Sequence, residues 1–208
     1  MKYLVNLRIG TRLRVGFGIT LLLLMVTGGL AMLQASRIYE GTREIADNWL
    51  VSVQTLAETR ALANGVRRAT LRSVLESEAS AKNGQRSQHD AALASMKGAM
   101  DSYEKLVSSP EERQLYDNLS KAWSAYLASD AKLLALSESG DAGFGAARSL
   151  ATGESAVLFA HAMDLIEQDV KLNRAGAGVA TAEAATNYHS TLLLTGVLCG
   201  TALLLSVA

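Results

Sequence analysis

Two long stretches without charge lie at opposite ends of the chain and predict two membrane-spanning helices. The first runs from Val15 to Leu33 and would be about 28 Å long as a helix, close to the hydrocarbon thickness of about 30 Å. The second begins near Leu192 and is still apolar at Ala208. A natural protein is not expected to end inside a membrane span, so we expect the sequence to be a fragment with a truncated second span.

A cleaved signal peptide is the alternative interpretation of the first stretch. Its apolar region is normally shorter, at about 7–15 residues, although Gly29-Leu30-Ala31 could pass as a cleavage site. Lys2, Arg8, Arg12 and Arg14 precede the stretch without any acidic residue. Because positive charge is retained on the cytoplasmic side, this arrangement predicts an N-terminus that faces the cytoplasm.

Between the two stretches, apolar residues recur every three or four positions, which is the period of an α-helix. The start of one helix is well marked by Ser109-Pro110-Glu111-Glu112, which supplies a cap serine, a first-turn proline and a Glu three residues after the serine. Pro110 is the only proline, as long helices require. The clearest apolar stripe follows it and comprises Leu115, Leu119, Ala122, Tyr126, Ser129, Leu133 and Leu136.

The pattern breaks at three places, which divide this region into helices. We predict helices over 37–80, 86–108, 110–138 and 153–190, a short helical piece over 142–151, and breaks at 82–84, 108–110 and 140–145. The first and last helices should continue from the membrane spans, because no helix breaker intervenes. Short connections favour antiparallel neighbours. The predicted fold is therefore all-α: an antiparallel up-down-up-down four-helix bundle with two flanking transmembrane helices.

Two short motifs give the sequence a family resemblance. The opening residues from Asn6 to Gly18, which run into a leucine-rich span, and the segment Trp123-Ser124-Ala125-Tyr126 resemble methyl-accepting chemotaxis proteins with a four-helix-bundle sensor. The resemblance implies a homodimer, a ligand site high in the bundle and a piston-like displacement of the last helix. It also implies cytoplasmic parts beyond this chain, a HAMP linker and a methylated coiled coil, through which an adaptor and a histidine kinase would be controlled.

The resemblance and the apolar pattern together suggest a division of the chain. We expect a bacterial inner-membrane protein, multi-pass, with the bundle in the periplasm. The expected parts are a cytoplasmic N-terminus over 1–14, a transmembrane helix over 15–35, a periplasmic ligand-binding bundle over 36–190 and a truncated second transmembrane helix over 191–208.

Composition narrows the possible chemistry. All 20 acidic residues lie between the spans, and the net charge of the chain is zero, which argues against a nucleic-acid partner. Cys199 is the only cysteine, so neither an internal disulfide nor a cysteine metal cluster is expected. His89, His161 and His189 lie far apart, and no nucleophile elbow or P-loop occurs. We expect no enzyme activity, no catalytic residue, no metal and no cofactor.

The arginines of the first bundle helix are the most informative polar residues. Arg60 and Arg67 fall near the middle of the face formed by Val53, Leu56, Ala63, Leu71 and Val74. A buried guanidinium needs a carboxylate, a ligand or water. If the first and last helices are antiparallel, Arg60 is level with Ile166 and Glu167 and close to Asp169, so an internal ion pair is expected. Arg67 is level with Phe159 and lacks an obvious partner, because Glu154 is the only acid nearby.

A small carboxylate is the ligand that such an arginine would bind, in bidentate fashion and oriented by hydroxyl groups. The resemblance extends the predicted site to Asn64, Arg67, Arg68, Arg72, Thr152 and Ser155, and Tyr126 is added because it is level with Arg67. Arg68 and Arg72 could instead be solvated, or paired with Glu76 and Glu78. The leading hypothesis is a chemoreceptor for an organic acid or amino acid. The alternatives are the same sensor on a histidine kinase or a cyclic-dinucleotide enzyme, and a non-sensory membrane-anchored scaffold.

Overall fold

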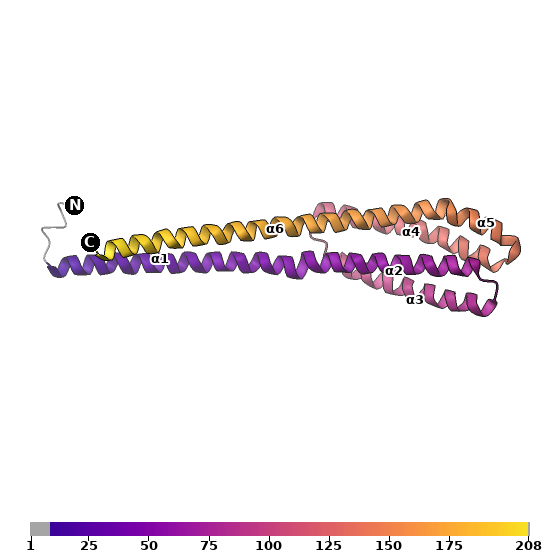
Figure 1. The fold of residues 1–208 in the computed structure, drawn as a ribbon, viewed down its shortest axis with the longest axis horizontal. Coiled ribbons are helices and arrows are strands. Elements are labelled where there is room, and N and C mark those ends of the chain that lie inside the picture. Colours follow the sequence, from indigo (N-terminus) through magenta and orange to yellow (C-terminus); the bar gives the residue numbers. More distant parts are fainter. Residues whose placement is uncertain (1–8, 208) are drawn as a thin grey trace. The chain divides into compact units, whose positions relative to one another are not determined.

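The structure, a computed structural model, describes residues 9–207 and is helical almost throughout. The predictions for Lys2, Arg8 and the first residues of the Asn6–Gly18 motif lie outside the described residues, as does the side chain of Arg12. The elements, shown in Figure 1, are α1 (Ile9–Glu44), a π-helical segment η1 (Ile45–Trp49), α2 (Leu50–Leu75), α3 (Ala79–Glu104), α4 (Pro110–Glu138), α5 (Asp141–Thr152) and α6 (Glu154–Val207).

The chain divides into two compact units, which we call the bundle and the terminal unit. The bundle comprises Ala46–Ala177, and the terminal unit comprises the described residues of 1–45 and 178–208. The bundle contains α2, α3, α4, α5 and the first part of α6. The terminal unit contains α1 and the rest of α6.

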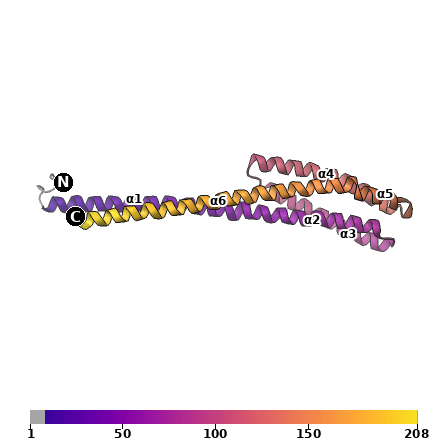
Figure 2. The same ribbon diagram turned by 45° about the horizontal axis from the view of Figure 1, so that its top comes forward.

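The bundle consists of four long helices with alternating direction, and α5 forms a short addition. Contacts between α3 and α4 pair His89 with Asp130 and Tyr103 with Glu112, an order that requires antiparallel helices. Figures 1 and 2 show α3 doubling back beside α2 in the same way. The predicted all-α four-helix bundle is confirmed. Its core is built on Leu56, Tyr103, Leu119, Tyr126 and Ile166, all at most 1% exposed, and burial of this apolar surface drives its formation.

The start of α4 follows the predicted capping pattern with one difference. Ser109 Oγ accepts a hydrogen bond from the Glu112 backbone N–H at 3.1 Å, and Pro110 occupies the first turn. The Glu112 carboxylate does not complete the capping box by binding the Ser109 N–H. It instead accepts from the backbone N–H of Ser108 at 2.7 Å. Glu112 is thereby drawn into the core, where it is fully buried.

The break predicted at 82–84 is wrong. Helix α2 ends at Leu75, and the chain reverses through Glu76 to Glu78, both of which have extended backbone angles. Gly84 lies inside α3. A glycine inside a helix costs only about 1 kcal/mol, and Lys82 anchors this first part of α3 by donating to the Ser137 carbonyl of α4. Local propensity is therefore overridden by packing.

The predicted continuity of the first and last helices is confirmed. Helical backbone runs unbroken from Ile9 through η1 to Leu75, and α6 is a single helix from Glu154 to Val207. The π-helical segment ends at Trp49, whose indole ring lies directly against Gly176 of α6, within the bundle. A side chain at position 176 would overlap the ring.

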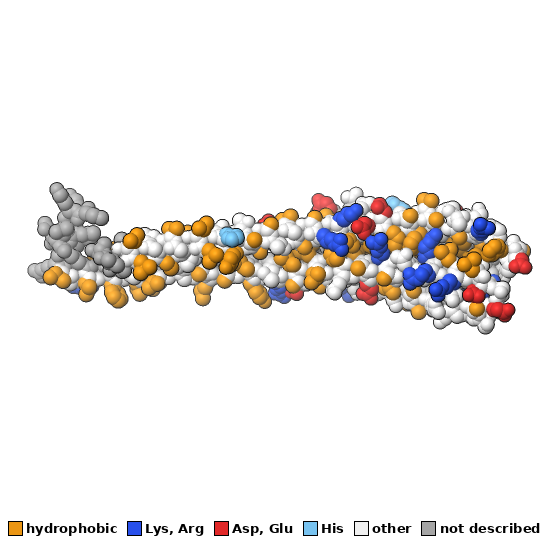
Figure 3. All heavy atoms as spheres, viewed as in Figure 1, with side chains coloured by type: hydrophobic (Ala, Val, Ile, Leu, Met, Phe, Trp, Pro, Cys, Tyr) orange, Lys and Arg blue, Asp and Glu red, His pale blue; other side chains and the backbone are white. Residues whose placement is uncertain are grey.

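The terminal unit exposes many large apolar side chains, including Phe17, Leu22 and Leu193, each more than 60% exposed. Figure 3 shows apolar side chains gathered over α1 and the C-terminal part of α6, whereas charged side chains gather over the bundle. Among the described residues, one helix, from Ile9 to Leu75, contains a segment apolar enough to cross a membrane, and none of that segment is buried. The second predicted span covers residues 191–208. The side chains at its end lie outside the described residues, so this span stays a prediction.

The contact between Trp49 and Gly176 predicts a selective effect of a single methyl group. We expect Gly176→Ala to lower the unfolding free energy by about 1–3 kcal/mol, because the added Cβ would overlap the indole ring. Thermal unfolding of the full chain followed by circular dichroism measures this change.

Gly178→Ala is the matched control on the same helix. A Cβ at Gly178 would meet no described atom within 4 Å, so this change should be neutral or stabilising by up to about 1 kcal/mol. Equal melting temperatures for the two variants would contradict the assigned contact.

Candidate functional site

The arginines of α2 lie at the edge of its buried face. The residues of α2 that are buried are Ser52, Leu56, Thr59, Ala63, Val66, Ala69, Thr70, Ser73 and Val74. The prediction that Arg60 lies in the middle of this face is wrong, because its side chain is 53% exposed. The predicted internal ion pair is confirmed, and Glu167 rather than Asp169 is the partner: Arg60 Nη1 lies 3.0 Å from Glu167 Oε2 on α6. Such an exposed pair contributes about 0–1 kcal/mol.

Arg67 is half-buried and joins three helices. Its Nη1 donates to the Ser155 carbonyl of α6 at 3.2 Å, and its Nη2 donates to the Ala151 carbonyl of α5 at 3.3 Å. Its guanidinium carbon lies 4.8 Å from the centroid of the Phe159 ring, which is a cation–π contact. This contact confirms the prediction that Arg67 is level with Phe159. Ala151 belongs to the last turn of α5, where free carbonyls and the helix dipole favour a cation.

The charge of Arg67 has no anionic partner among the described residues. Its partners are two neutral carbonyl oxygens, the Phe159 ring and the neutral Tyr126 hydroxyl, so the prediction that it lacks any obvious partner is only partly correct. No ion pair between Arg67 and Glu154 occurs within residues 9–207. Carbonyl oxygens accept hydrogen bonds from the guanidinium but do not neutralise its charge, as a carboxylate would. The arrangement therefore leaves a partly buried positive charge that an anion could neutralise.

Two other predicted site residues lie close to Arg67. Tyr126 packs against Phe159 with ring centroids 5.1 Å apart, and its hydroxyl donates to Asp130 Oδ1 at 3.0 Å. Ser155 is fully buried, and its Oγ has no hydrogen-bond partner among the described atoms. Arg67, Tyr126 and Ser155 are thus gathered around Phe159.

The remaining predicted residues do not join this group. Asn64 Nδ2 donates to the Arg60 carbonyl of its own helix at 2.8 Å, and the exposed Thr152 hydroxyl donates to the Arg148 carbonyl at 2.9 Å. Arg68 and Arg72 are exposed. Within the described part of the chain neither forms an ion pair, so the alternative pairing with Glu76 and Glu78 is not observed.

A buried histidine that the sequence analysis did not single out connects α3 to the same region. His89 Nε2 lies 2.8 Å from Asp130 Oδ2, and its Nδ1 lies 2.8 Å from Asp90 Oδ1. Asp130 also accepts from Tyr126, so a polar chain runs from the surface to the ring beside Arg67. The Asp130 hydrogen bond raises the pKa of His89, and burial opposes it. The sequence held one signal for this polar chain: Asp130 follows Tyr126 by four residues, the spacing of neighbours on one helix face.

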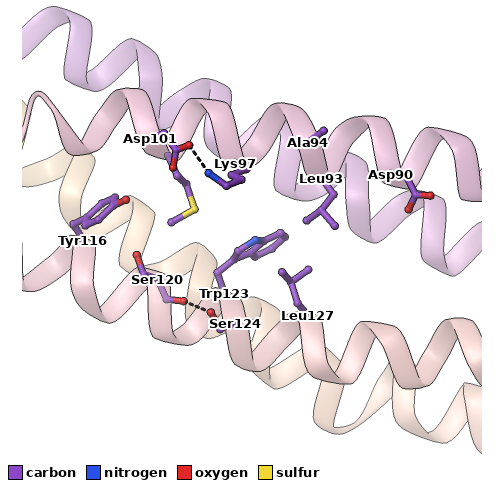
Figure 4. A pocket seen from close by; sticks show the side chains of 11 residues that line it. Asp90, Leu93, Ala94, Lys97, Asp101, Tyr116, Ser120, Trp123, Ser124 and Leu127 are labelled. Atoms are coloured by element: carbon purple, nitrogen blue, oxygen red, sulfur yellow. Dashed lines mark hydrogen bonds and ion pairs between the residues drawn. The ribbon is translucent and has the colours of Figure 1, made fainter.

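A groove of about 600 Å³ lies between parts of α3 and α4. The Trp123 indole points into it between Leu93 and Leu127, as Figure 4 shows. Lys97 at its rim is already bound to Asp101 at 2.6 Å. Arg67 does not line this groove, so the groove and the arginine site are separate features.

The architecture and the comparisons agree on the class of protein. An all-α four-helix bundle whose end helices continue into uncovered apolar segments is the arrangement of a membrane-associated sensory module. Residues 6–188 match the family described as "Four helix bundle sensory module for signal transduction". The chain belongs to this family of sensory modules.

The chain is also similar to a named bacterial protein. It is 22% identical over 190 residues to "Putative sensory transducer protein YvaQ" of Bacillus subtilis (strain 168). The aligned region covers 91% of this chain and 33% of that relative, so the chain spans about a third of the relative's length. The chain is therefore similar to a sensory transducer over one part of a longer protein.

The environment of His89 predicts how it titrates. We expect a midpoint above 6.5, because the Asp130 hydrogen bond favours the imidazolium more than burial disfavours it. The stability that this raised pKa contributes is present below pH 6.5 and is lost as the pH rises through the folded midpoint. Nuclear magnetic resonance of the histidine rings in the full chain measures the midpoint.

Comparison with His89→Gln identifies the resonance of His89. Asp130→Asn should lower the midpoint of His89, because it removes the principal cause of the raised pKa. A midpoint at or below 6.5 in the unmodified protein would show that the paired geometry is not formed.

Proposed function

We propose that this chain is the sensory portion of a transmembrane chemoreceptor that binds a small carboxylate, an organic acid or an amino acid. The observation that carries the proposal is Arg67, a half-buried guanidinium without an anionic partner among the described residues. A binding site is the function that best explains why such a charge lies between three helices.

Recognition depends on an exchange of partners at Arg67. A ligand carboxylate replaces the two neutral carbonyl oxygens and forms a bidentate, charge-assisted pair with the guanidinium. The Ser155 hydroxyl, buried and without a partner among the described atoms, is available to orient the ligand. Arg68 and Arg72, exposed on the same helix, attract the anion and add contacts at the rim. Asn64 lies near them in sequence, and Thr152 lies near Ser155.

Signalling follows from the helix that Arg67 holds. When Arg67 releases the Ser155 carbonyl, the start of α6 loses one of its contacts with α2. Because α6 is one helix as far as Val207, a displacement at Ser155 is carried along it. The size of the shift is limited by the difference in ligand affinity between the two arrangements.

The proposed setting is the bacterial inner membrane. The chain crosses the lipid twice, keeps its N-terminus in the cytoplasm, places the bundle in the periplasm and functions as a homodimer. Regions beyond this chain carry the output to a kinase and its adaptor, since the chain spans only 33% of the transducer to which it is similar. Attachment to a histidine kinase or a cyclic-dinucleotide enzyme would use the same sensor. A non-sensory scaffold is the remaining alternative.

Ligand binding is tested by thermal unfolding of the full chain in detergent against short mono- and dicarboxylic acids and α-amino acids. A compound present at 100 times its dissociation constant should add about 2.7 kcal/mol to the unfolding free energy. Arg67→Ala should abolish this increment, because the carboxylate loses its bidentate partner. Loss of the α5 contacts also lowers the basal stability of this variant, so the increment is the quantity compared.

Arg174→Ala, which removes an exposed arginine of α6, is the matched control and should keep the increment. If no carboxylate stabilises the chain, or if Arg67→Ala responds as the unmodified protein does, a scaffold with a purely structural Arg67 is the better account.

A further inference from the structure

A second polar group, buried far from Arg67, joins α6 to the turn between α3 and α4. Tyr103 comes from the end of α3, Glu112 from the start of α4, and Asp169 and Asn173 from α6; none is more than 1% exposed. Tyr103 Oη lies 2.9 Å from Glu112 Oε1 and 2.6 Å from Asp169 Oδ1. One phenol therefore bridges two buried carboxyl groups.

Glu112 is fully provided with hydrogen-bond donors. Its Oε2 accepts from the Ser108 backbone N–H at 2.7 Å and from Ser108 Oγ at 3.2 Å. Its Oε1 lies within reach of Tyr103 Oη and of Asn173 Nδ2, the latter at 3.1 Å. A carboxylate with this many donors is stabilised in its charged form.

Asp169 has fewer donors than Glu112: its Oδ1 accepts from Tyr103 Oη at 2.6 Å and from Asn173 Nδ2 at 3.1 Å. Its Oδ2 is buried and has no partner among the described atoms, and the same holds for Asn173 Oδ1. The Tyr103 hydroxyl carries one hydrogen, so it cannot donate to Glu112 and Asp169 at once. If both carboxyl groups were charged, one of them would lose its phenol donor inside the core, at a cost in free energy.

No positive charge among the described residues compensates for this. Arg60 on α2 and Lys171 on α6 both point to Glu167, at 3.0 and 4.0 Å. Arg113, which follows Glu112 on α4, pairs with Glu104 of α3 at 3.0 Å. No cluster of three or more potential metal ligands occurs in the described part of the chain. A proton is the simplest cation that completes the group.

We propose that Asp169 is a proton-binding site through which the bundle senses mildly acidic external pH. In the protonated state Asp169 Oδ1 donates to the Tyr103 oxygen, and Tyr103 donates its own hydrogen to Glu112. The contacts of Tyr103 Oη with Glu112 and with Asp169 are then both hydrogen bonds, each with its own hydrogen and its own acceptor. When Asp169 loses the proton, two carboxylates compete for the single Tyr103 hydrogen, and α6 is held less firmly to α3 and α4.

The electrostatics of the group support this assignment. Burial raises the pKa of Asp169 to about 6, the Glu112 charge acts in the same direction, and hydrogen bonds from Tyr103 and Asn173 oppose the shift. Burial also raises the pKa of Tyr103 above its ordinary value, so the phenol keeps its hydrogen. Since the ordinary pKa of Asp is 3.8, the stabilisation is complete below that pH and is lost as the pH rises through about 6.

The position of the group gives the proton an effect on α6. Asp169 and Asn173 precede Gly176, where Trp49 packs at the end of the bundle, whereas Arg67 holds α6 at Ser155. Proton and carboxylate would thus act on the same helix at different points. The output through α6 rests on the proposed function, but proton binding by Asp169 does not.

Proton binding is tested on the full chain by infrared spectroscopy and by ¹³C resonance of labelled aspartate carboxyl groups, from pH 4 to pH 8. We expect one buried carboxylic acid band that disappears with a midpoint near pH 6 and is absent from Asp169→Asn. Asp164→Asn, at an exposed position of the same helix, should keep it. Glu112→Gln should lower the midpoint, because the neighbouring negative charge is removed.

Coupling to α6 is tested separately by pulsed electron resonance between spin labels at the exposed positions Lys105 and Arg174, with Cys199→Ser and His89→Gln in the background. The distance distribution should change with the same midpoint, and Asp169→Asn should stay in its acidic form at pH 8. If the carboxylic acid band is found but the distance between the spin labels does not change with pH, the coupling to α6 is refuted and proton binding is established.

Two results would overturn proton binding itself. The first is the absence of a buried carboxylic acid band at pH 5 in the unmodified chain, a measurement that does not depend on any variant folding. The second is a midpoint that moves when sodium chloride is exchanged for choline chloride, which would assign the group to a metal cation. Neither result bears on carboxylate binding at Arg67.

Discussion

The antiparallel register between α2 and α6 is the constraint on which the rest of the bundle depends. Two contacts between these helices fix it, Arg60 with Glu167 and Arg67 with the Ser155 carbonyl, and Trp49 of η1 against Gly176 extends the same alignment. A shift of one residue would rotate each partner by about 100° around its helix axis and break all three. Apolar packing alone tolerates such slippage better, so the polar and steric contacts specify the alignment.

The same contacts explain why a sensory bundle can be both stable and responsive. Its large apolar core stabilises the fold, while two buried or half-buried polar contacts on α6, at Arg67 and at Asp169, are incompletely satisfied among the described groups. An incompletely satisfied buried group has an environment that a ligand or proton can improve. In the proposed function, binding would change the balance between two nearby arrangements without dismantling the core.

Much of this could be predicted from the sequence, because period, caps and the absence of proline determine long helices. These rules give the range of α4 and the continuity of α6. They also place Glu167 opposite Arg60 and Phe159 opposite Arg67. The α2–α3 break could not be predicted, since Gly84 looks like a stronger breaker than the segment from Glu76 to Glu78. The polar cluster of Tyr103, Glu112 and Asp169 could not be found either, because it requires three helices to meet.

If Arg67 exchanges its carbonyl partners for a ligand carboxylate, as we propose, α6 should move relative to α2. The most direct test is the distance between spin labels at the exposed positions Glu58 on α2 and Gln168 on α6, measured in the full chain with Cys199→Ser, with and without the most stabilising carboxylate. We expect a ligand-dependent shift in this distance that disappears in Arg67→Ala. An identical distance distribution at saturating carboxylate would contradict it.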